Sequence, residues 1–450
     1  MKKGFLFTLL AATSIVANAH SADIFDSMAN AYSNNPTLQA GRAQLRSVDE
    51  SVAIANSGFR PTLAIQGSYN DSHTHHELQE LDTGYDESVA AVAKQSVFSG
   101  FATYNSVKAA KENVKAQQSN LSNIEQQVLL SASTAYLNVL RDESIVELQK
   151  NNEKLLKKRL DETQERFNVG EVTRTDVSQA QARHSQAISD RIAAEGNLAV
   201  SKAIYIQVVG SNPENLVEPQ GLVDLFPATM EEAFSAAQTN NYGVMAAKSA
   251  LKSQEYVVNA NTGALLPQVN FEAKAVRGQS YAPLTKDPET NSYAWGVNVT
   301  VPLYNSGETR AKIRQSKYQK WQAQENLLEA QRAMVSDVSS NWEYMVSSKA
   351  RIQSVQDQIK AYEIALDGVQ QEEALGNRTV LDVLDAYQSL LNSKVEEVRA
   401  RRDFYVSGMQ LLMSMGKLTA KDLKLEVDLY DAKKHSKETA GKWLSLSVEK

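Results

Sequence analysis

The sequence repeats one plan at a constant offset. Pro267 lies 206 residues after Pro61, and the same interval separates four other pairs. An internal repeat constrains the fold strongly, because both copies must adopt a similar structure. We expect a first repeat over 20–210, a linker over 211–228, a second repeat over 229–416 and a C-terminal segment over 417–450. The other pairs are Tyr136 and Trp342, Gly170 and Gly376, Asp176 and Asp382, and Gly210 and Gly416.

The N-terminus has the three parts of a secretory signal peptide. Lys2 and Lys3 precede a short, mostly apolar run, and Ala17-Asn18-Ala19 forms a small-x-small cleavage site. We therefore predict a signal peptide over 1–19, with Ala22 as a second possible cleavage position. Later in the chain no apolar run reaches the length of a spanning helix, so we predict no transmembrane helix.

Composition excludes several classes of function. The chain has no cysteine, which excludes thiolate metal sites, cysteine catalysis and a lipid-modified cysteine. The formal net charge of -6 gives no support to a nucleic-acid partner, which would require a basic patch. The sequence also lacks the phosphate-binding loop, the zinc-protease helix and the serine-hydrolase order. We therefore expect no enzyme activity and no cofactor.

Proline spacing shows where long helices can form. No proline lies between Pro61 and Pro213, and no proline follows Pro302. Because proline breaks helices, these two stretches are where long helices can form. Residues 101–168 read as one helix of roughly 100 Å at about 1.5 Å per residue. A seven-residue apolar seam near the C-terminus predicts packing against a neighbouring helix with left-handed supercoiling. Its members are Leu384, Leu391, Val398, Tyr405 and Leu412.

Four segments alternate between apolar and small or polar residues. They are 62–70, 88–98, 268–276 and 292–301, and the last is the clearest because Tyr293, Trp295, Val297, Val299 and Val301 share one face. Such alternation predicts strands with one apolar and one wet side. We expect two hairpins, at about 61–100 and about 267–305, closed by polar loops over 71–87 and 277–291.

Strands with an apolar outer face enter a membrane only when no edge is left open. Single-chain barrels need about eight strands, and this chain offers four. The strands therefore either pack on a soluble core or share one barrel with other chains. Their wet alternate faces favour a shared barrel around water, with the long helices extending the wall of the pore.

Motifs in order along the chain resemble the TolC family of outer-membrane channels. The resemblance covers the mature chain to about residue 430. It implies a mixed all-α plus transmembrane β fold in which two structural repeats give four barrel strands and long coiled-coil tunnel helices. The motifs are NNPTLQAGRAQL, RPTLAIQGSY, QSVFSG, TAYLNVL, RFNVGEVTRTDV, LLPQVNFEA, VNVTVPLYNSG and LGNRTVLDVLDAYQSLLNSK.

Assembly and partners also follow from this resemblance. It implies a homotrimer with a trimeric, twelve-stranded barrel in outer-membrane lipid, helices extending into the periplasm, and a belt formed by the linker and the C-terminal segment. Partners would be a periplasmic adaptor and an inner-membrane ABC or other transporter. The cargo would be proteins, by type I secretion, or small toxic molecules, and the missing lipid-anchor cysteine favours protein secretion. The alternative is a coiled-coil structural or adhesive surface protein without a pore.

The resemblance also assigns roles at the periplasmic entrance. Asp382 and Asp385 match aspartates that line it, so six carboxylates in a trimer would raise some pKa values and attract cations. Arg378 matches an arginine that closes the entrance, and Thr175 and Asp176 match its polar partners. Without the resemblance, each of these residues has a simpler interpretation. The two aspartates, in the first turn of a helix, would only interact favourably with the helix dipole. Thr175 would be an ordinary helix cap, and Arg378 would be a solvated side chain.

Two glycines and one histidine cluster complete the candidate sites. Gly170 and Gly376 lie between helix patterns and predict the turns at the tunnel tips. At Glu373 the family pattern has a tyrosine, so one closing link is replaced or missing. His73, His75 and His76 stand beside Asp71 and Glu77. Because a solvated loop is the default for such residues, we predict no metal site.

Overall fold

The computed structural model describes residues 23–76, 79–281, 289–439, 441–443 and 445–448. The predicted signal peptide lies outside these residues. The chain divides into two compact units, each formed from three stretches of sequence. The first holds Ser131–Leu225 and Arg351–Arg402 with the N-terminal stretch to Ala31, and the second holds Tyr32–Leu130, Phe226–Ala350 and Asp403–Lys450.

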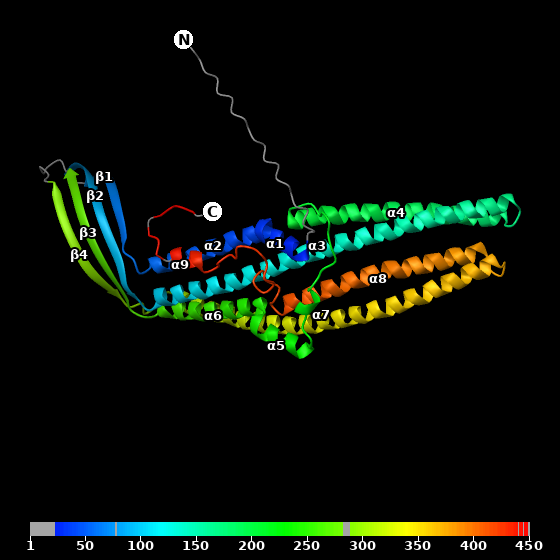
Figure 1. Cartoon of the computed structure of the whole chain (residues 1–450). Helices are drawn as coiled ribbons and strands as arrows, with labels where there is room; N and C mark the ends of the chain where they lie inside the picture. Colours follow the sequence, from blue (N-terminus) through cyan, green and yellow to red (C-terminus); the bar gives the residue numbers. More distant parts are fainter. Residues whose placement is uncertain (1–22, 77–78, 282–288, 440, 444, 449–450) are drawn as a thin grey trace, which may run out of the picture. The chain divides into compact units, whose positions relative to one another are not determined.

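The first unit is built from parts of four long helices (Figure 1). They are α3 (Ala102–Asn168), α4 (Arg174–Val209), α7 (Glu308–Ala374) and α8 (Val380–Ser414). The predicted helix over 101–168 is confirmed as α3, because no proline or glycine interrupts it. In the described part of the chain, no helix is long and apolar enough to cross a bilayer.

Small side chains at seven-residue intervals line the buried face of α4. Ala180, Ala187, Ala194 and Ser201 are all buried. Ala187 packs with Leu156 of α3 and Leu384 of α8. Small residues at this spacing let helices approach closely along one narrow seam. In the seam predicted on α8, Leu384, Leu391 and Leu412 are buried, while Val398 and Tyr405 are half-buried.

A tyrosine of the repeated plan holds the linker in the first unit. The hydroxyl of Tyr136 donates to the carbonyl oxygen of Val217 at 2.6 Å and accepts from the Val217 amide at 3.0 Å. Tyr136 is fully buried, and burial raises the pKa of its hydroxyl to about 12. The linker also contains the short 3-10 helix η1 (Val223–Leu225), and Leu222 just before it is buried.

The second unit contains a four-stranded antiparallel sheet (Figure 1). Its strands are β1 (Thr62–His76), β2 (Gln79–Ser99), β3 (Gln268–Tyr281) and β4 (Thr290–Thr300), in the order β1-β2-β3-β4. Pro61 and Pro267, one repeat apart, directly precede β1 and β3. The unit's shorter helices are α2 (Pro36–Ser57), α5 (Met230–Asn240), α6 (Tyr242–Gly263) and α9 (Lys434–Thr439), and α1 (Ile24–Asn34) ends in it.

Strand register places the four predicted apolar faces on one side of the sheet. Leu63 stands opposite Ala93, Ala93 opposite Ala273, and Ala273 opposite Trp295. Because opposite residues in an antiparallel pair point to the same face, this row fixes one shared apolar surface. Leu63 and Trp295 are 81% and 77% exposed on it.

The polar loops predicted over 71–87 and 277–291 were drawn too long. Strand β1 continues to His76 and β2 begins at Gln79, while β3 continues to Tyr281 and β4 begins at Thr290. The backbone ladder continues through polar residues because its hydrogen bonds need no apolar side chains. In the extension of β1, Ser72 donates to the carbonyl of Gly84 on β2.

A glycine from the repeated plan allows α8 to end against α5. Gly416 has a φ of +72°, and a Cβ there would lie 2.1 Å from the carbonyl oxygen of Asn240. Gly210, its counterpart one repeat earlier, has a φ of +85°, and no neighbouring atom lies within 4 Å of the position that a Cβ would take there. The two positions share left-handed backbone but differ in crowding.

This pair gives the first prediction. Gly210→Ala pays only for the left-handed backbone and should lower the free energy of unfolding by about 1–2 kcal/mol. Gly416→Ala also forces two backbones apart and should cost distinctly more. Thermal unfolding followed by circular dichroism would compare the two purified variants. Equal losses of stability would show that the contact with Asn240 is not tight.

Candidate functional site

Two helical turns, one repeat apart, have the same backbone geometry. Gly170 and Gly376 have φ values of +84° and +80°. After each glycine an amide reaches back over the end of the helix, from Glu171 to the Arg166 carbonyl and from Asn377 to the Glu372 carbonyl, both at 2.9 Å. This is the Schellman pattern, in which glycine supplies the left-handed residue. The expectation that both glycines form turns between helices is confirmed.

Each turn leads into a helix capped by a threonine and an aspartate. Thr173 accepts from the Asp176 amide at 3.3 Å, and Asp176 accepts from the Thr173 amide at 2.9 Å. Thr379 and Asp382 repeat this arrangement at 3.2 and 2.9 Å. Reciprocal bonds of this kind satisfy amides that a helix start leaves open. The interpretation of Thr175 as the cap is therefore wrong, because Thr173 occupies that position.

The cap also fixes the charge of Asp382. Hydrogen bonds from the amide and hydroxyl of Thr379 hold the pKa of the Asp382 carboxyl below its ordinary value. Asp382 is therefore ionised at neutral pH. Asp385, one helical turn further on, forms an ion pair with Arg183 of α4.

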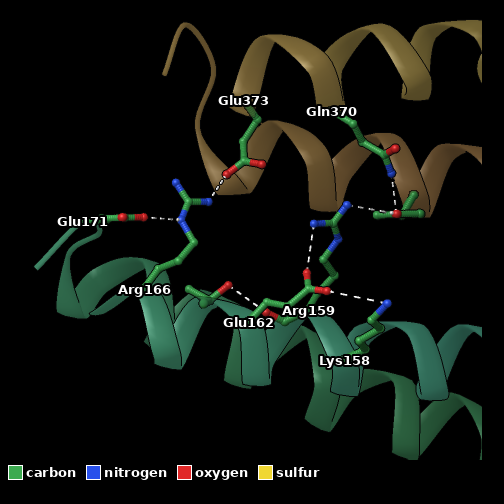
Figure 2. Close-up of polar contacts among 9 residues, drawn as sticks. Lys158, Arg159, Glu162, Arg166, Glu171, Gln370 and Glu373 are labelled. Carbon is green, nitrogen blue, oxygen red and sulfur yellow. Dashed lines mark hydrogen bonds and ion pairs between the residues drawn. The ribbon is translucent and has the colours of Figure 1, made fainter. Parts of the chain in front are cut away.

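An ion pair links the two turns within the first unit. Arg166, near the end of α3, bonds to Glu373, near the end of α7, and its Nε also lies 3.3 Å from Glu171 (Figure 2). Glu373 is 11% exposed, whereas Arg166 is 39% exposed. Glu373 is the position where the family pattern has tyrosine, so this ion pair stands where the sequence predicted a replaced or missing link.

A second link lies about two helical turns before the first. Arg159 of α3 donates to the hydroxyl of Tyr387 on α8 at 3.3 Å and to Glu162 at 3.1 Å. Gln370 of α7 donates to the same Tyr387 hydroxyl. The Arg159 guanidinium also lies 5.6 Å from the centre of the Tyr387 ring. Three helices are thereby joined at one phenol, to which both Arg159 and Gln370 donate (Figure 2).

The three residues expected to close the entrance lie at these turns. Arg378 donates from Nε to Glu372 at 2.8 Å across its own turn, and this contact raises the pKa of the Arg378 guanidinium. Asp176 is engaged in the cap of α4, and Thr175 is exposed. Within one chain each of them therefore has a local contact or faces solvent, and their role between chains stays a prediction.

Of the residues that join the turns, only Glu373 was singled out in the sequence. Arg159, Arg166, Tyr387 and Gln370 lie in helices whose charged positions read as solvated faces. The sequence did contain one indication of this ion pair, because Arg166 and Glu373 carry opposite charges and each lies shortly before one of the repeated glycines. The signal is weak because most such positions do carry solvated charges.

Among the residues that the structure describes, no cluster of three or more acidic or histidine side chains could hold a metal ion. His73 Nε2 lies 3.6 Å from Asp71 on an exposed strand. The side chains of His75, His76 and Glu77 lie outside the described part of the chain.

A family model described as outer membrane efflux protein matches residues 28–210 and 233–417. The two matched segments correspond closely to the two repeats predicted at 20–210 and 229–416. The match leaves out the linker and the C-terminal segment, which lie outside the duplicated plan.

Individual proteins agree with this match. The outer membrane efflux protein BepC of Brucella suis is 36% identical over 439 residues, which covers 97% of this chain and 95% of BepC. The outer membrane protein TolC of Escherichia coli is 23% identical over 405 residues, covering 87% and 81% of the two chains. A crystal structure of CusC superposes with a TM-score of 0.79 at 16% identity, covering 90% and 95%. The likeness to CusC shows the fold.

The link between the turns gives the second prediction. Arg166→Gln should destabilise the protein more than Glu373→Gln, because Glu373 would stay nearly buried without its cation, whereas Arg166 keeps Glu171. Comparison of the double variant with the two single variants gives the coupling free energy between Arg166 and Glu373. It should be at most about 1 kcal/mol, because Arg166 is partly exposed. Chemical unfolding of the four proteins would measure it.

The exposed pair of Arg378 and Glu372 is the matched control. Their side chains are 50% and 51% exposed, so Arg378→Gln and Glu372→Gln should show almost no coupling. Equal coupling in both pairs, or a greater loss from Glu373→Gln than from Arg166→Gln, would contradict the assigned role.

Proposed function

The chain belongs to the outer membrane efflux protein family, and we propose that it forms the outer-membrane channel of a tripartite export machine. Family members are channels rather than enzymes, and the location is the outer membrane. The proposal concerns the assembly, the partners and the roles of individual residues.

The observation that carries the proposal is a sheet with one apolar face and two edges. In the described sheet β1 and β4 each pair on one side, so both present unpaired backbone groups. Its apolar face is exposed on β1, on β4 and at Val89 of β2, and it is half-buried on β3. Hydrocarbon cannot satisfy an open edge, so the sheet enters lipid only as part of a closed barrel. Pairing β1 of one chain with β4 of the next closes the ring.

Three chains are the number that we propose. Three copies of a four-stranded sheet give twelve strands, within the range of outer-membrane barrels. The first residue of β1 pairs with Lys94, five residues inside the end of β2. A barrel requires strands to be staggered and tilted in this way.

The inner face of the sheet suits a water-filled lumen. Lys94 and Glu272 form an ion pair at 3.7 Å on this face, and Ser68 and Ser88 share a hydrogen bond at 2.7 Å. Polar interior side chains alternate with lipid-facing ones in barrels that enclose water. The coiled-coil alternative has no use for such a sheet, and the channel proposal accounts for both faces.

The helical turns at Gly170 and Gly376 serve as the periplasmic tips in this proposal. A periplasmic adaptor docks there and connects the channel to an inner-membrane ABC or other transporter. Arg378, Thr175 and Asp176 contribute to closing the entrance between chains. Support comes from the shared geometry of the two turns and from the charged side chains that they expose.

Asp382 and Asp385 form the constriction of the entrance in this proposal. Both follow the second turn on one face of α8, and Asp382 is held in its charged form. A ring of carboxylates selects cations by electrostatic attraction. Asp385 shares its charge with Arg183, so its contribution depends on whether that ion pair opens.

Two classes of cargo fall within the proposal. Efflux is the term in the descriptions of the family model and of BepC. Protein secretion was favoured by the absence of a lipid-anchor cysteine. The helical wall and the sheet would serve either cargo, because the transporter selects it.

The assembly gives the third prediction. The mature protein extracted from outer membranes should migrate as a trimer in detergent, because a single sheet leaves two open edges. It should also form ion-conducting pores in a planar bilayer. Light scattering and bilayer recording measure the two properties. A protein that stays monomeric and forms no pores would refute the channel.

The constriction gives the fourth prediction. Replacing Asp382 and Asp385 together by Asn should shift the reversal potential in a potassium chloride gradient towards zero, since carboxylates at the entrance attract cations. Asp357→Asn removes an exposed carboxylate of α7 that lies 19 residues before Gly376, and it is the control. It should leave the selectivity unchanged. Unchanged selectivity in the double variant would exclude these aspartates as the constriction.

A further inference from the structure

The C-terminal segment lies along helix α2 within the second unit (Figure 1). The Tyr430 amide of this segment donates to the hydroxyl of Tyr32 at 3.0 Å, and the Arg42 guanidinium lies 5.1 Å from the Tyr430 ring centre. Gln118 of α3 donates to the carbonyl of Ala432 at 3.1 Å. We name residues 430–439 and 441–443 the C-terminal strap.

A buried contact between His435 and Asp49 holds the middle of the C-terminal strap. His435 Nδ1 lies 3.0 Å from Asp49 Oδ2, and the Asp49 side chain is fully buried. Thr439 at the end of α9 is buried as well. The strap contacts Arg42 and then Asp49 of α2, and finally Arg60 after the helix, so it runs in the same direction as the helix. It is therefore a fixed element of the fold along this length.

The strap ends beside the first residues of the sheet. The Arg60 guanidinium lies 4.5 Å from the centre of the Trp443 ring, and Arg60 Nη1 donates to the carbonyl of Lys442 at 3.5 Å. Arg60 lies two residues before β1, and Gln95 of β2 donates to the carbonyl of Phe59 at 3.2 Å. Trp443 is thereby placed where the sheet meets the helices, and it is 67% exposed.

Other exposed apolar side chains occur at the same end of the strands. Phe59 precedes β1, Phe101 follows β2, and Leu303 and Tyr304 follow β4. Leu303 is 87% exposed. A soluble surface rarely gathers large apolar side chains in this way, whereas aromatic side chains flanking a sheet are typical of a bilayer interface.

The height of the sheet's apolar surface explains why the flanking residues are needed. On β4 this surface runs from Tyr293 to Val299, a length of about 20 Å at about 3.4 Å per residue. A tilt of about 40° reduces its height to about 16 Å. The apolar band of an outer-membrane barrel is about 25 Å tall. Side chains beyond the strand ends must therefore supply the remaining height.

We propose that the tip of the C-terminal strap, Lys442 and Trp443, inserts in the phospholipid interface at the helix-attached end of the sheet. This inference rests on the proposed channel, because that channel places the sheet in the membrane. Tryptophan prefers the interface, since its ring is apolar and its N–H is polar. Arg60 and Lys442 supply positive charge for lipid phosphates beside it. Leu446 and Val448 beyond the tip are exposed and apolar.

The experiment uses the full mature chain in nanodiscs of phosphatidylethanolamine and phosphatidylglycerol. The protein has four tryptophans, so three single-tryptophan proteins are made with the other tryptophans replaced by phenylalanine. They retain Trp443, Trp295 or Trp321. Lipids carrying a spin-label quencher near the headgroup or deep in the acyl chain are compared with unlabelled lipids.

Trp443 should lose most of its fluorescence with the shallow quencher and less with the deep one. Trp295, on the outer face of β4, should be quenched by labelled lipid and reports whether the sheet is in the membrane. Trp321 lies 13 residues after the start of α7, about 20 Å along the helix, and should be unaffected by labelled lipid.

The outcomes separate the two proposals. Quenching of Trp295 without quenching of Trp443 would overturn the lipid contact and leave the channel standing. The same conclusion follows if Trp443 is shielded from acrylamide yet insensitive to labelled lipid, because protein would then cover it. Absence of quenching at Trp295 would overturn the channel and with it the lipid contact.

Discussion

Backbone hydrogen bonding at the edges of the sheet is the constraint on which the proposed assembly depends. Four strands pair in sequence order and leave β1 and β4 with one neighbour each. In water such edges are solvated, but in hydrocarbon each unpaired amide costs several kcal/mol. In the proposed channel, the chain therefore completes the edges of its sheet with other chains. The duplication supplies two hairpins per chain, and in the proposed assembly the number of chains sets the size of the barrel.

The helices satisfy a different constraint, which is to form a wall without a thick core. Their buried stripe is narrow, and on α4 it includes a run of small residues every seven positions. Narrow seams let helices pack side by side while their other faces stay polar. Two tyrosines form hydrogen bonds that connect elements to one another. Tyr136 holds the linker, and Tyr387 joins α3, α7 and α8.

The two copies of the plan share their turns and differ in their cross-links. Glycine, threonine and aspartate recur at the same offsets and produce the same turn and cap. Arg166 and Glu373 do not recur, because the equivalent positions are Glu372 and Phe167. Duplication therefore accounts for the local geometry of both tips. Divergence after it accounts for the ion pair that joins them and for the carboxylate at Asp385.

The sequence by itself determined the elements whose causes are local. Proline-free stretches predicted the long helices, alternation predicted four strands, and repeated glycines predicted the turns, because each depends on neighbours in the chain. Strand lengths and the cap at Thr173 were misjudged, since ladders extend through polar residues and several threonines compete for one cap. Only the tertiary structure decided the strand register, the pairing of Arg166 with Glu373 and the course of the C-terminal strap. Arg166 and Glu373 are 207 positions apart, and Tyr32 and Tyr430 are 398 positions apart. A charge or an aromatic ring carries no local signal of the partner that folding brings to it.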